Sequence, residues 1–338
     1  MVGGDGGERV KLDIMTSGPI LEITDLAIDI HSNAIVDCVS MAIGSRQIVA
    51  LVGESGSGKS LTALSIVKLQ PNVARIAGGR VSLNGVNLTA LSDAALAAVR
   101  GNDVAVIFQE PIASLNPLMH VGAQIEETLR LHRRVSPEAA RREAIAMMAK
   151  VGISDAPRRA RQFPFELSGG MCQRIMIAAA LICRPALLIA DEPTTALDVT
   201  IQAQILELMR TLRDDAGTAI MLITHDMGVV ADIADQVYVM YGGRIAESGP
   251  VQAIFAEPRH PYTRLLLATI PRLDGVRKTR LKAIEGSVPS AGHWPSGCRF
   301  RSRCPLADRA CEETPPLKSV GDDHFSACWH ADRVGGIA

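Results

Sequence analysis

The residues from Gly53 to Ser60 carry the strongest chemical pattern in the sequence. They read Gly-Glu-Ser-Gly-Ser-Gly-Lys-Ser, follow the apolar run Ile48–Val52 and precede a stretch with helical periodicity. This order matches G-x-x-x-x-G-K-[ST], in which backbone N–H groups close around phosphate oxygens at the start of a helix. Lys59 would then reach the β- and γ-phosphates of a nucleotide, and the Ser60 hydroxyl would bind Mg²⁺. The residues expected to contact the nucleotide are Gly53, Ser55, Gly56, Ser57, Gly58, Lys59, Ser60 and Leu61.

Two acidic residues, Asp191 and Glu192, directly follow a second apolar run, Ala186–Ala190. In a parallel sheet the carboxyl ends of the strands face the crevice that binds ligands. We therefore expect Asp191 to hold Mg²⁺ through water, and Glu192 to orient the attacking water or accept its proton. The alternative is a strand end capped by solvated acids, and the phosphate loop in the same chain argues against it.

A third pattern, Leu167-Ser168-Gly169-Gly170, precedes a helix-like run that continues to Cys183. Ser168 can cap this helix, and the glycine pair leaves its first N–H groups open. Helix capping alone would also explain Ser-Gly-Gly at this place. The pattern nevertheless predicts a second anion site at the amino end of a helix.

Alternating strands and helices would position these residues. Residues 20–52 alternate apolar and polar side chains, which indicates antiparallel strands, and Asn84-Gly85 predicts a hairpin turn. The later apolar runs are typical of buried parallel strands separated by helices, and they include Val104–Phe108, Ala219–Thr224 and Val237–Met240. The sequence predicts an α/β fold with a parallel sheet.

In this setting the segment Leu167–Arg174 resembles the signature of the ABC ATPases, with Met171 in place of the usual Gln. The resemblance implies that Gln109 contacts Mg²⁺ or water and responds to a membrane partner, and that His225 holds the γ-phosphate. It also implies that Asp198 communicates across an ATPase dimer. Two such subunits would close head to tail, with ATP between the phosphate loop of one and Ser168–Gly170 of the other.

The resemblance further implies a RecA-like α/β core, an antiparallel β subdomain and a helical subdomain near 110–165. The expected divisions are a disordered tail (1–19), an ABC ATPase domain (20–255) and a small Cys-rich C-terminal domain (256–338). In the segment Leu26–His31, where the family usually has an aromatic residue against adenine, there is no Phe, Tyr or Trp. Ile30 or His31 would take that place.

Composition excludes several classes of protein. Apolar residues are 47% of the chain, which excludes a disordered protein, and the net charge is −1 (35 basic minus 36 acidic residues). With 3% aromatic residues as well, the chain is not expected to bind nucleic acid. We find no run of about 18 apolar residues that would span a membrane, and no apolar core of a signal peptide near the start. We therefore expect a cytosolic location.

Four of the seven cysteines crowd into the last 41 residues, with the spacing C-x5-C-x6-C-x16-C. In a reducing compartment such a cluster suggests metal more than disulfides. The four thiolates, from Cys298, Cys304, Cys311 and Cys328, could hold a [4Fe–4S] cluster or Zn²⁺, or could have no ligand. The nearby His324 and His330 are expected to be solvated.

The last third of the chain resembles the ATPases of oligopeptide, dipeptide and nickel importers, for example in His260-Pro261-Tyr262-Thr263 and Gly297-Cys298-Arg299-Phe300. This resemblance supports the [4Fe–4S] alternative. It implies a second, similar ATPase subunit, two permease subunits and an extracytoplasmic solute-binding protein, with this chain peripheral at the cytoplasmic face of the cell membrane. The implied function is to energise peptide import. Nickel chelates, glutathione or another small solute are alternative cargoes, and a non-transport ABC ATPase is a further alternative.

Overall fold

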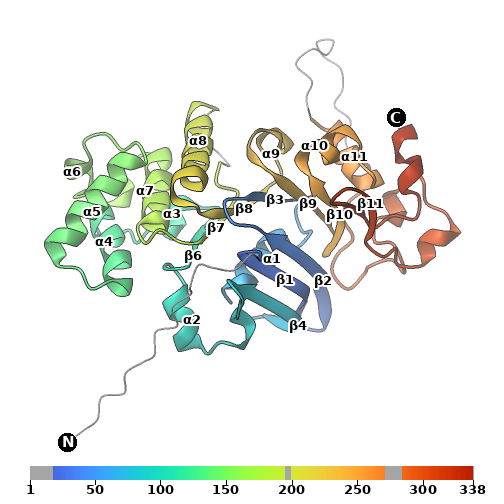
Figure 1. The fold of residues 1–338 in the computed structure, drawn as a ribbon, viewed down its shortest axis with the longest axis horizontal. Helices are drawn as coiled ribbons and strands as arrows, with labels where there is room; N and C mark the ends of the chain where they lie inside the picture. Colours follow the sequence, from blue (N-terminus) through green and yellow to red (C-terminus); the bar gives the residue numbers. More distant parts are fainter. Residues whose placement is uncertain (1–17, 195–198, 271–283, 338) are drawn as a thin grey trace, which may run out of the picture.

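The computed structural model describes residues 18–194, 199–270 and 284–337. A group of helices, α3 to α7, lies at one end of its longest axis, and the C-terminal tail lies at the other end, with two sheets between them (Figure 1). The tail is here the described part of residues 256–338. Most of the predicted N-terminal tail, and all of the predicted dimer-contact segment around Asp198, lie outside the described residues.

The smaller sheet is antiparallel and has the strand order β2-β1-β4-β5. Its strands are β1 (Leu21–Ile30), β2 (Asn33–Ile43), β4 (Ala74–Leu83) and β5 (Val86–Asn87). Asn84 and Gly85 join β4 to β5 with φ angles of 48° and 80°, as a tight hairpin turn requires. The predicted hairpin is confirmed.

The larger sheet has the order β11-β12-β10-β9-β3-β8-β7-β6, with parallel pairing from β9 to β6. Its strands are β3 (Ile48–Val52), β6 (Val104–Ile107), β7 (Leu187–Asp191), β8 (Ala219–Thr224), β9 (Gln236–Tyr241), β10 (Arg244–Pro250), β11 (Lys318–Gly321) and β12 (His324–Ser326). Every residue of β3, β7 and β8 is buried, which explains their continuous apolar runs.

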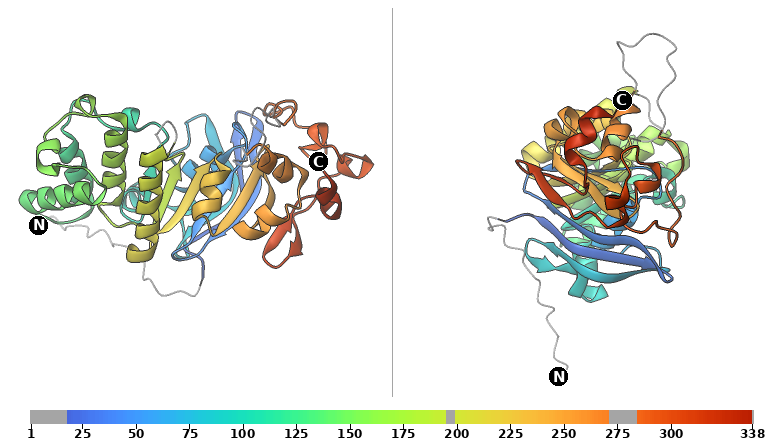
Figure 2. Two further views of the ribbon diagram at one scale, coloured as in Figure 1. Left: turned by 90° about the horizontal axis from the view of Figure 1, so that it is seen from above. Right: turned by 90° about the vertical axis from the view of Figure 1, so that its right-hand side faces the viewer.

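Helices α4 to α7 pack together at one end of the molecule, away from the tail (Figure 2), while α9 to α11 pack against β3, β8, β9 and β10. The helices are α1 (Lys59–Ile66), α2 (Asp93–Val99), α3 (Pro111–Ser114), α4 (Val121–His132), α5 (Pro137–Lys150), α6 (Ala156–Arg159), α7 (Gly169–Leu181), α8 (Val199–Ala216), α9 (Met227–Ile233), α10 (Val251–Ala256) and α11 (Pro261–Ala268). Helices α3 to α6 occupy the range 110–165 in which a helical subdomain is expected.

Strand β3 lies between two apolar layers. Its Val49 and Leu51 pack into a core shared with the antiparallel sheet, while Ala50 and Val52 pack with α9 and with residues of the tail such as Phe300. Because neighbouring residues of a strand point to opposite faces, one buried strand joins both layers. The loop that follows β3 is therefore anchored from both sides.

The C-terminal residues continue the core sheet. Strand β12 pairs antiparallel with β10 and with β11, so the tail adds two strands at the edge of the larger sheet. Phe300 is 2% exposed and packs against Tyr241 and Tyr262. This arrangement does not support the separate Cys-rich domain that the sequence predicted.

Glu247 on β10 connects this edge of the larger sheet to two segments of the tail. Its carboxylate is fully buried and accepts hydrogen bonds from the N–H groups of Arg259 (2.6 Å) and His260 (2.9 Å). Its third polar contact is His324 Nε2 of β12, at 2.7 Å. The burial of Glu247 is therefore matched by polar partners from two segments.

We expect Glu247→Ala to reduce the free energy of unfolding by about 3 kcal/mol, because it leaves buried polar groups without partners. Urea unfolding followed by tryptophan fluorescence would measure this loss, since both tryptophans, Trp294 and Trp329, lie in the tail. The matched control is Glu22→Ala on an exposed position of β1. Equal stability of the two variants would contradict the role given to Glu247.

Candidate functional site

The phosphate loop joins β3 to α1, in the strand–loop–helix order that the sequence predicted. Gly53 has a φ of 148°, and a Cβ there would lie 2.1 Å from the carbonyl oxygen of Met240. Gly58 caps α1 with a φ of 99°, in the left-handed region that side chains disfavour. Both positions need glycine, and together they bring the backbone round in a tight turn ahead of the helix.

Lys59 lies inside this turn. Its side chain donates hydrogen bonds from Nζ to the carbonyl oxygens of Gly53 (2.7 Å) and Glu54 (2.9 Å), and the residue is 7% exposed. Burial lowers the pKa of Lys59, an effect that Glu192, Asp191 and Glu54 oppose. The loop thus holds an ammonium group at the place where the pattern requires one.

Asp191, the last residue of β7, lies beside the phosphate loop. Burial raises the pKa of Asp191, while a hydrogen bond with Ser60 lowers it. Its Oδ1 is buried and has no hydrogen-bond partner among the described residues. A buried carboxylate oxygen without a donor, next to a serine hydroxyl, suits an oxygen-binding cation such as Mg²⁺.

Glu192 lies between the other two predicted catalytic residues. Gln109 Nε2 donates to Glu192 Oε2 at 2.8 Å, and His225 Nδ1 lies 3.0 Å from Glu192 Oε1. Glu192 has a φ of 48°, and its N–H donates to the carbonyl of Ile223. The three side chains come from the ends of β6, β7 and β8, which are neighbours in the sheet. The structure therefore gathers Gln109, Glu192 and His225 into one group.

The Ser168–Gly170 segment begins α7. Ser168 caps the helix, with its Oγ accepting a hydrogen bond from the N–H of Met171 at 3.3 Å. Ser168 and Gly169 are exposed, and nothing lies within 4 Å of a Cβ built on Gly169. In the described part of the chain no hydrogen bond joins this segment to the phosphate loop. Its open face is free to meet another molecule.

Two tail residues contact the phosphate loop, and the sequence patterns did not predict this. The Tyr262 hydroxyl accepts a hydrogen bond from the N–H of Glu54 at 2.7 Å. Arg303 forms an ion pair with the Glu54 carboxylate at 2.6 Å. These partners are 208 and 249 residues away from Glu54 in the sequence, so no local pattern could have identified them.

The four tail cysteines are free thiols, of which Cys311 is buried and Cys298, Cys304 and Cys328 are half-buried. Burial, with a smaller contribution from the other three cysteines, raises the pKa of Cys328 to about 12. Burial likewise raises the pKa of Cys304 to about 11. Among the described residues, the sulfur atoms of these four cysteines do not form a group within 4.8 Å of one another, so the geometry does not support the predicted four-cysteine metal site.

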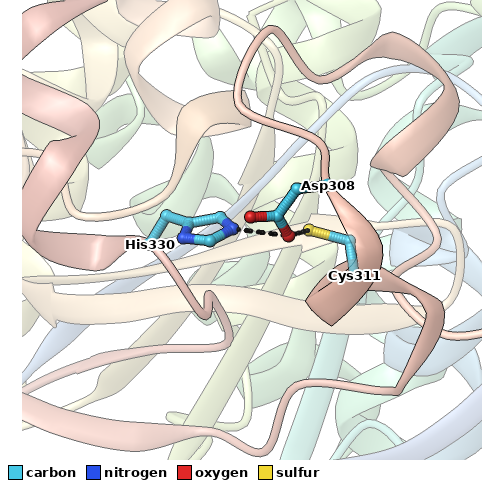
Figure 3. Close-up of side chains that lie close together, drawn as sticks. All are labelled: Asp308, Cys311 and His330. Atoms are coloured by element: carbon cyan, nitrogen blue, oxygen red, sulfur yellow. Dashed lines mark hydrogen bonds and ion pairs between the residues drawn. The ribbon is translucent and has the colours of Figure 1, made fainter.

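The prediction that His324 and His330 are solvated is wrong. His324 is 5% exposed and pairs with Glu247, while His330 Nε2 lies 3.0 Å from Asp308 Oδ1. Asp308, Cys311 and His330 have ligand atoms all within 4.8 Å of one another (Figure 3). Asp308 and Cys311 are three residues apart, whereas His330 lies 19 residues beyond Cys311, so its approach to them arises from the folded tail.

Comparison with known proteins agrees with this geometry. The family model described as "ABC transporter" matches residues 36–195, and the model described as "Oligopeptide/dipeptide transporter, C-terminal region" matches residues 246–311. Separately, the described residues hold no helix with both the length and the apolar character needed to cross a membrane.

Two relatives from Brucella are similar over nearly their whole length. One, from Brucella melitensis, is 49% identical over 330 residues, which cover 93% of this chain and 98% of the relative. Another, from Brucella abortus, is 45% identical and covers 93% of this chain and 96% of its own length. Both are named as peptide import ATP-binding proteins.

Among solved structures, a dimeric ATP-binding cassette bound to ADP and phosphate has a TM-score of 0.62 and 25% identity, over 68% of this chain and 98% of that chain. A subunit of an ABC transporter complex from Clostridium perfringens has a TM-score of 0.63 at 23% identity, over 71% and 92% of the two chains, and shares the fold. With a phosphate loop, a strand-end carboxylate pair and relatives this similar, the chain belongs to the family of ABC transporter ATP-binding proteins.

Proposed function

We propose that this chain hydrolyses ATP to energise the import of peptides through an ABC transporter. The observation that carries the proposal is the position of Glu192, held between Gln109 and His225 at the strand ends beside a complete phosphate loop. The peptide cargo is supported by the names of the relatives and by the match of residues 246–311 to the oligopeptide/dipeptide C-terminal region.

In the proposed reaction Glu192 orients the attacking water and accepts its proton. His225 holds the γ-phosphate and, through its contact with Glu192, keeps that carboxylate directed at the water. Lys59 and the loop N–H groups bind the phosphates, while Ser60, Asp191 and Gln109 are the proposed ligands of Mg²⁺. Bound Mg²⁺ would neutralise charge on the phosphate oxygens. The contacts to Leu61, Ser55 and the loop glycines belong to the same proposed site.

A second, homologous ATPase subunit completes the proposed site. The exposed Ser168 and Gly169, with the half-buried Gly170, would contact the γ-phosphate of ATP that is bound to the partner, because a helix amino end attracts anions. Asp198 would carry the signal across the interface. The exposure of Ser168 and Gly169, together with the lack of a hydrogen bond between this segment and the phosphate loop among the described residues, supports a pairing of two subunits, and we propose a heterodimer.

A groove next to Gln109 suits a permease. A cavity of about 370 Å³ is lined by residues of β6, α3, α4 and α7 and of neighbouring loops, including Phe108, Leu115 and Met119. Beside it, Ile112 and Leu118 are 64% and 85% exposed. Exposed apolar side chains around a cavity are typical of a protein contact. We propose that a helix of one of two permease subunits docks here, at the cytoplasmic face of the membrane, with a solute-binding protein on the other side.

The experiment is uptake of a labelled oligopeptide by vesicles that contain the reconstituted transporter. Leu118→Asp is expected to lower peptide uptake about tenfold, because it places a charge in an apolar contact, while ATP binding to the isolated subunit stays at the wild-type value. The matched control is Leu131→Asp, an exposed leucine near the carboxyl end of α4, whereas Leu118 lies between the cavity-lining residues Asn116 and Met119. Wild-type uptake by the Leu118→Asp transporter would refute the docking site.

The same assay separates the alternative cargoes. Uptake of a nickel chelate, glutathione or another small solute, with no peptide uptake, would keep the ATPase and change the cargo. ATP hydrolysis that no permease stimulates would favour a non-transport ABC ATPase instead.

We also propose that Cys298, Cys304, Cys311 and Cys328 hold a [4Fe–4S] cluster, with Zn²⁺ as the alternative. The support is the spacing of these four cysteines within the last 41 residues, and a cluster there would supply structural order and a redox centre. Iron, sulfide and zinc analysis of the purified protein, with its visible absorbance, distinguishes the two. A folded tail without metal would refute both.

A further inference from the structure

Glu54 connects the phosphate loop to the C-terminal tail. The loop pattern leaves this position open to any residue. The carbonyl oxygen of Glu54 binds within the loop: it accepts hydrogen bonds from Lys59 Nζ at 2.9 Å and from the N–H of Ser57 at 3.2 Å. The carboxylate instead forms two hydrogen bonds with Arg303, Nη1 to Oε2 at 2.6 Å and Nη2 to Oε1 at 3.0 Å.

The Arg303 side chain is held in one orientation. It is 4% exposed, against 27% for the Glu54 side chain. Its Nε donates to the carbonyl of Glu285 at 2.8 Å, and the guanidinium lies over the rings of Tyr241 and Phe300 at 5.8 and 5.9 Å. A two-point contact to a carboxylate, combined with packing on aromatic rings, is specific to arginine. The ion pair between Glu54 and Arg303 is therefore held in one geometry by several contacts of the folded protein.

The tail holds the backbone of Glu54 as well. The N–H of Glu54 donates to the hydroxyl of Tyr262, which is fully buried and packs against Phe300 with ring centres 5.4 Å apart. One residue of the loop is thus fixed at its N–H and at its carboxylate by the tail, and at its carbonyl by Lys59.

A second tail arginine, Arg299, contacts the phosphate loop indirectly, through the backbone of the Gly242–Gly243 turn. Arg299 donates to the carbonyl of Gly242 and pairs with Asp37 of β2 at 2.6 Å. The neighbouring Gly243 donates its N–H to the carbonyl of Ser57 in the loop at 2.9 Å. Arg299 directly follows Cys298, and Arg303 directly precedes Cys304. The segment between these two cysteines is therefore packed against the phosphate loop and its neighbours.

The charge of Glu54 gives this contact a consequence for binding. A carboxylate one residue into an anion-binding loop repels phosphate, and in a partly buried site the repulsion is poorly screened. We propose that Arg303 is a positioning residue for ATP: it neutralises and fixes Glu54, so that the tail sets the affinity of the phosphate loop. This inference rests on the proposed function, because it assumes that ATP binds at this loop.

The test measures the equilibrium binding of N-methylanthraniloyl-ATP with Mg²⁺ to the purified full-length chain. Arg303→Met is expected to raise the dissociation constant about tenfold, because it leaves an uncompensated carboxylate on the phosphate-binding loop. The double variant Glu54→Gln/Arg303→Met removes that carboxylate and is expected to return to within about threefold of the wild type. A purely structural arginine would not be rescued by this second change.

The matched control is Arg309→Ala, an exposed arginine of the same tail, which is expected to bind like the wild type. Glu54→Gln alone is expected to bind at least as tightly as the wild type, and it tests the charge argument even if Arg303→Met fails to fold. Wild-type affinity of Arg303→Met, an unrescued double variant or tenfold weaker binding by Glu54→Gln would each overturn the inference. If the wild type itself does not bind the nucleotide, the proposed function fails instead.

Discussion

Glu192→Gln is expected to bind ATP with about the wild-type affinity and to hydrolyse it about a hundredfold to ten-thousandfold more slowly, which is the usual contribution of a general base. The amide keeps the size of the side chain and can still contact Gln109 and His225, which lie 2.8 and 3.0 Å from the two carboxylate oxygens. It has no lone pair basic enough to take a proton from water. We therefore expect the variant to keep its affinity for ATP and to lose most of its rate of hydrolysis.

The measurement is phosphate release by the reconstituted transporter, together with retention of labelled ATP on the subunit. The control is Glu138→Gln, an exposed residue in the first turn of α5, which should release phosphate at the wild-type rate. Wild-type phosphate release by Glu192→Gln, with partners present, would remove Glu192 from the chemical step. Loss of ATP binding would instead assign it to holding the nucleotide.

Local patterns predicted the elements of this site well. The turn from Gly53 to Ser60 depends on glycines whose geometry, such as the φ of 148° at Gly53, is set within a few residues. The buried strands follow directly from continuous apolar runs such as Ile48–Val52. The sequence order of the motifs, read through the family resemblance, indicated that Gln109, Glu192 and His225 belong to one site, and the structure gathers them. Their roles stay predictions.

Long-range pairing was the part that local patterns missed. His324 was expected in solvent, yet β12 brings it to Glu247, which lies 77 residues earlier in the chain. The expected separate tail domain instead extends the core sheet through the pairing of β12 with β10. Neither strand has a strong apolar alternation, and β12 is three residues long. Such short edge strands are fixed by tertiary contacts, which a periodicity argument does not detect.

Local sequence patterns also did not predict the contact between Glu54 of the phosphate loop and Arg303 of the tail. Position 54 is unconstrained in the loop pattern, and a glutamate there is typical of a solvated loop side chain. Only the folded tail reveals that the carboxylate is paired. The sequence thus predicted the groups that touch phosphate, while the groups that hold them in place come from residues more than 200 positions away.

Lys59→Met is expected to weaken ATP binding about a hundredfold and to reduce turnover to background, because it removes the ammonium group aimed at the phosphates. In the structure Nζ binds the carbonyls of Gly53 and Glu54, so these oxygens lose a donor too. Methionine has a similar length and fits a site where Lys59 is 7% exposed. The burial that lowers the pKa of Lys59 also favours the neutral replacement, so the fold should tolerate the change.

Binding of N-methylanthraniloyl-ATP and the midpoint of thermal unfolding, measured on the same preparation, separate the two effects. The control is Lys68→Met, a lysine just after α1 whose Nζ donates to the carbonyl of Leu91, away from the phosphate loop. We expect Lys68→Met to bind the nucleotide like the wild type and Lys59→Met to unfold near the wild-type temperature. If Lys59→Met bound as tightly as the wild type, the loop would hold phosphate through its backbone alone. The lysine would then act only as a support for the carbonyls of Gly53 and Glu54.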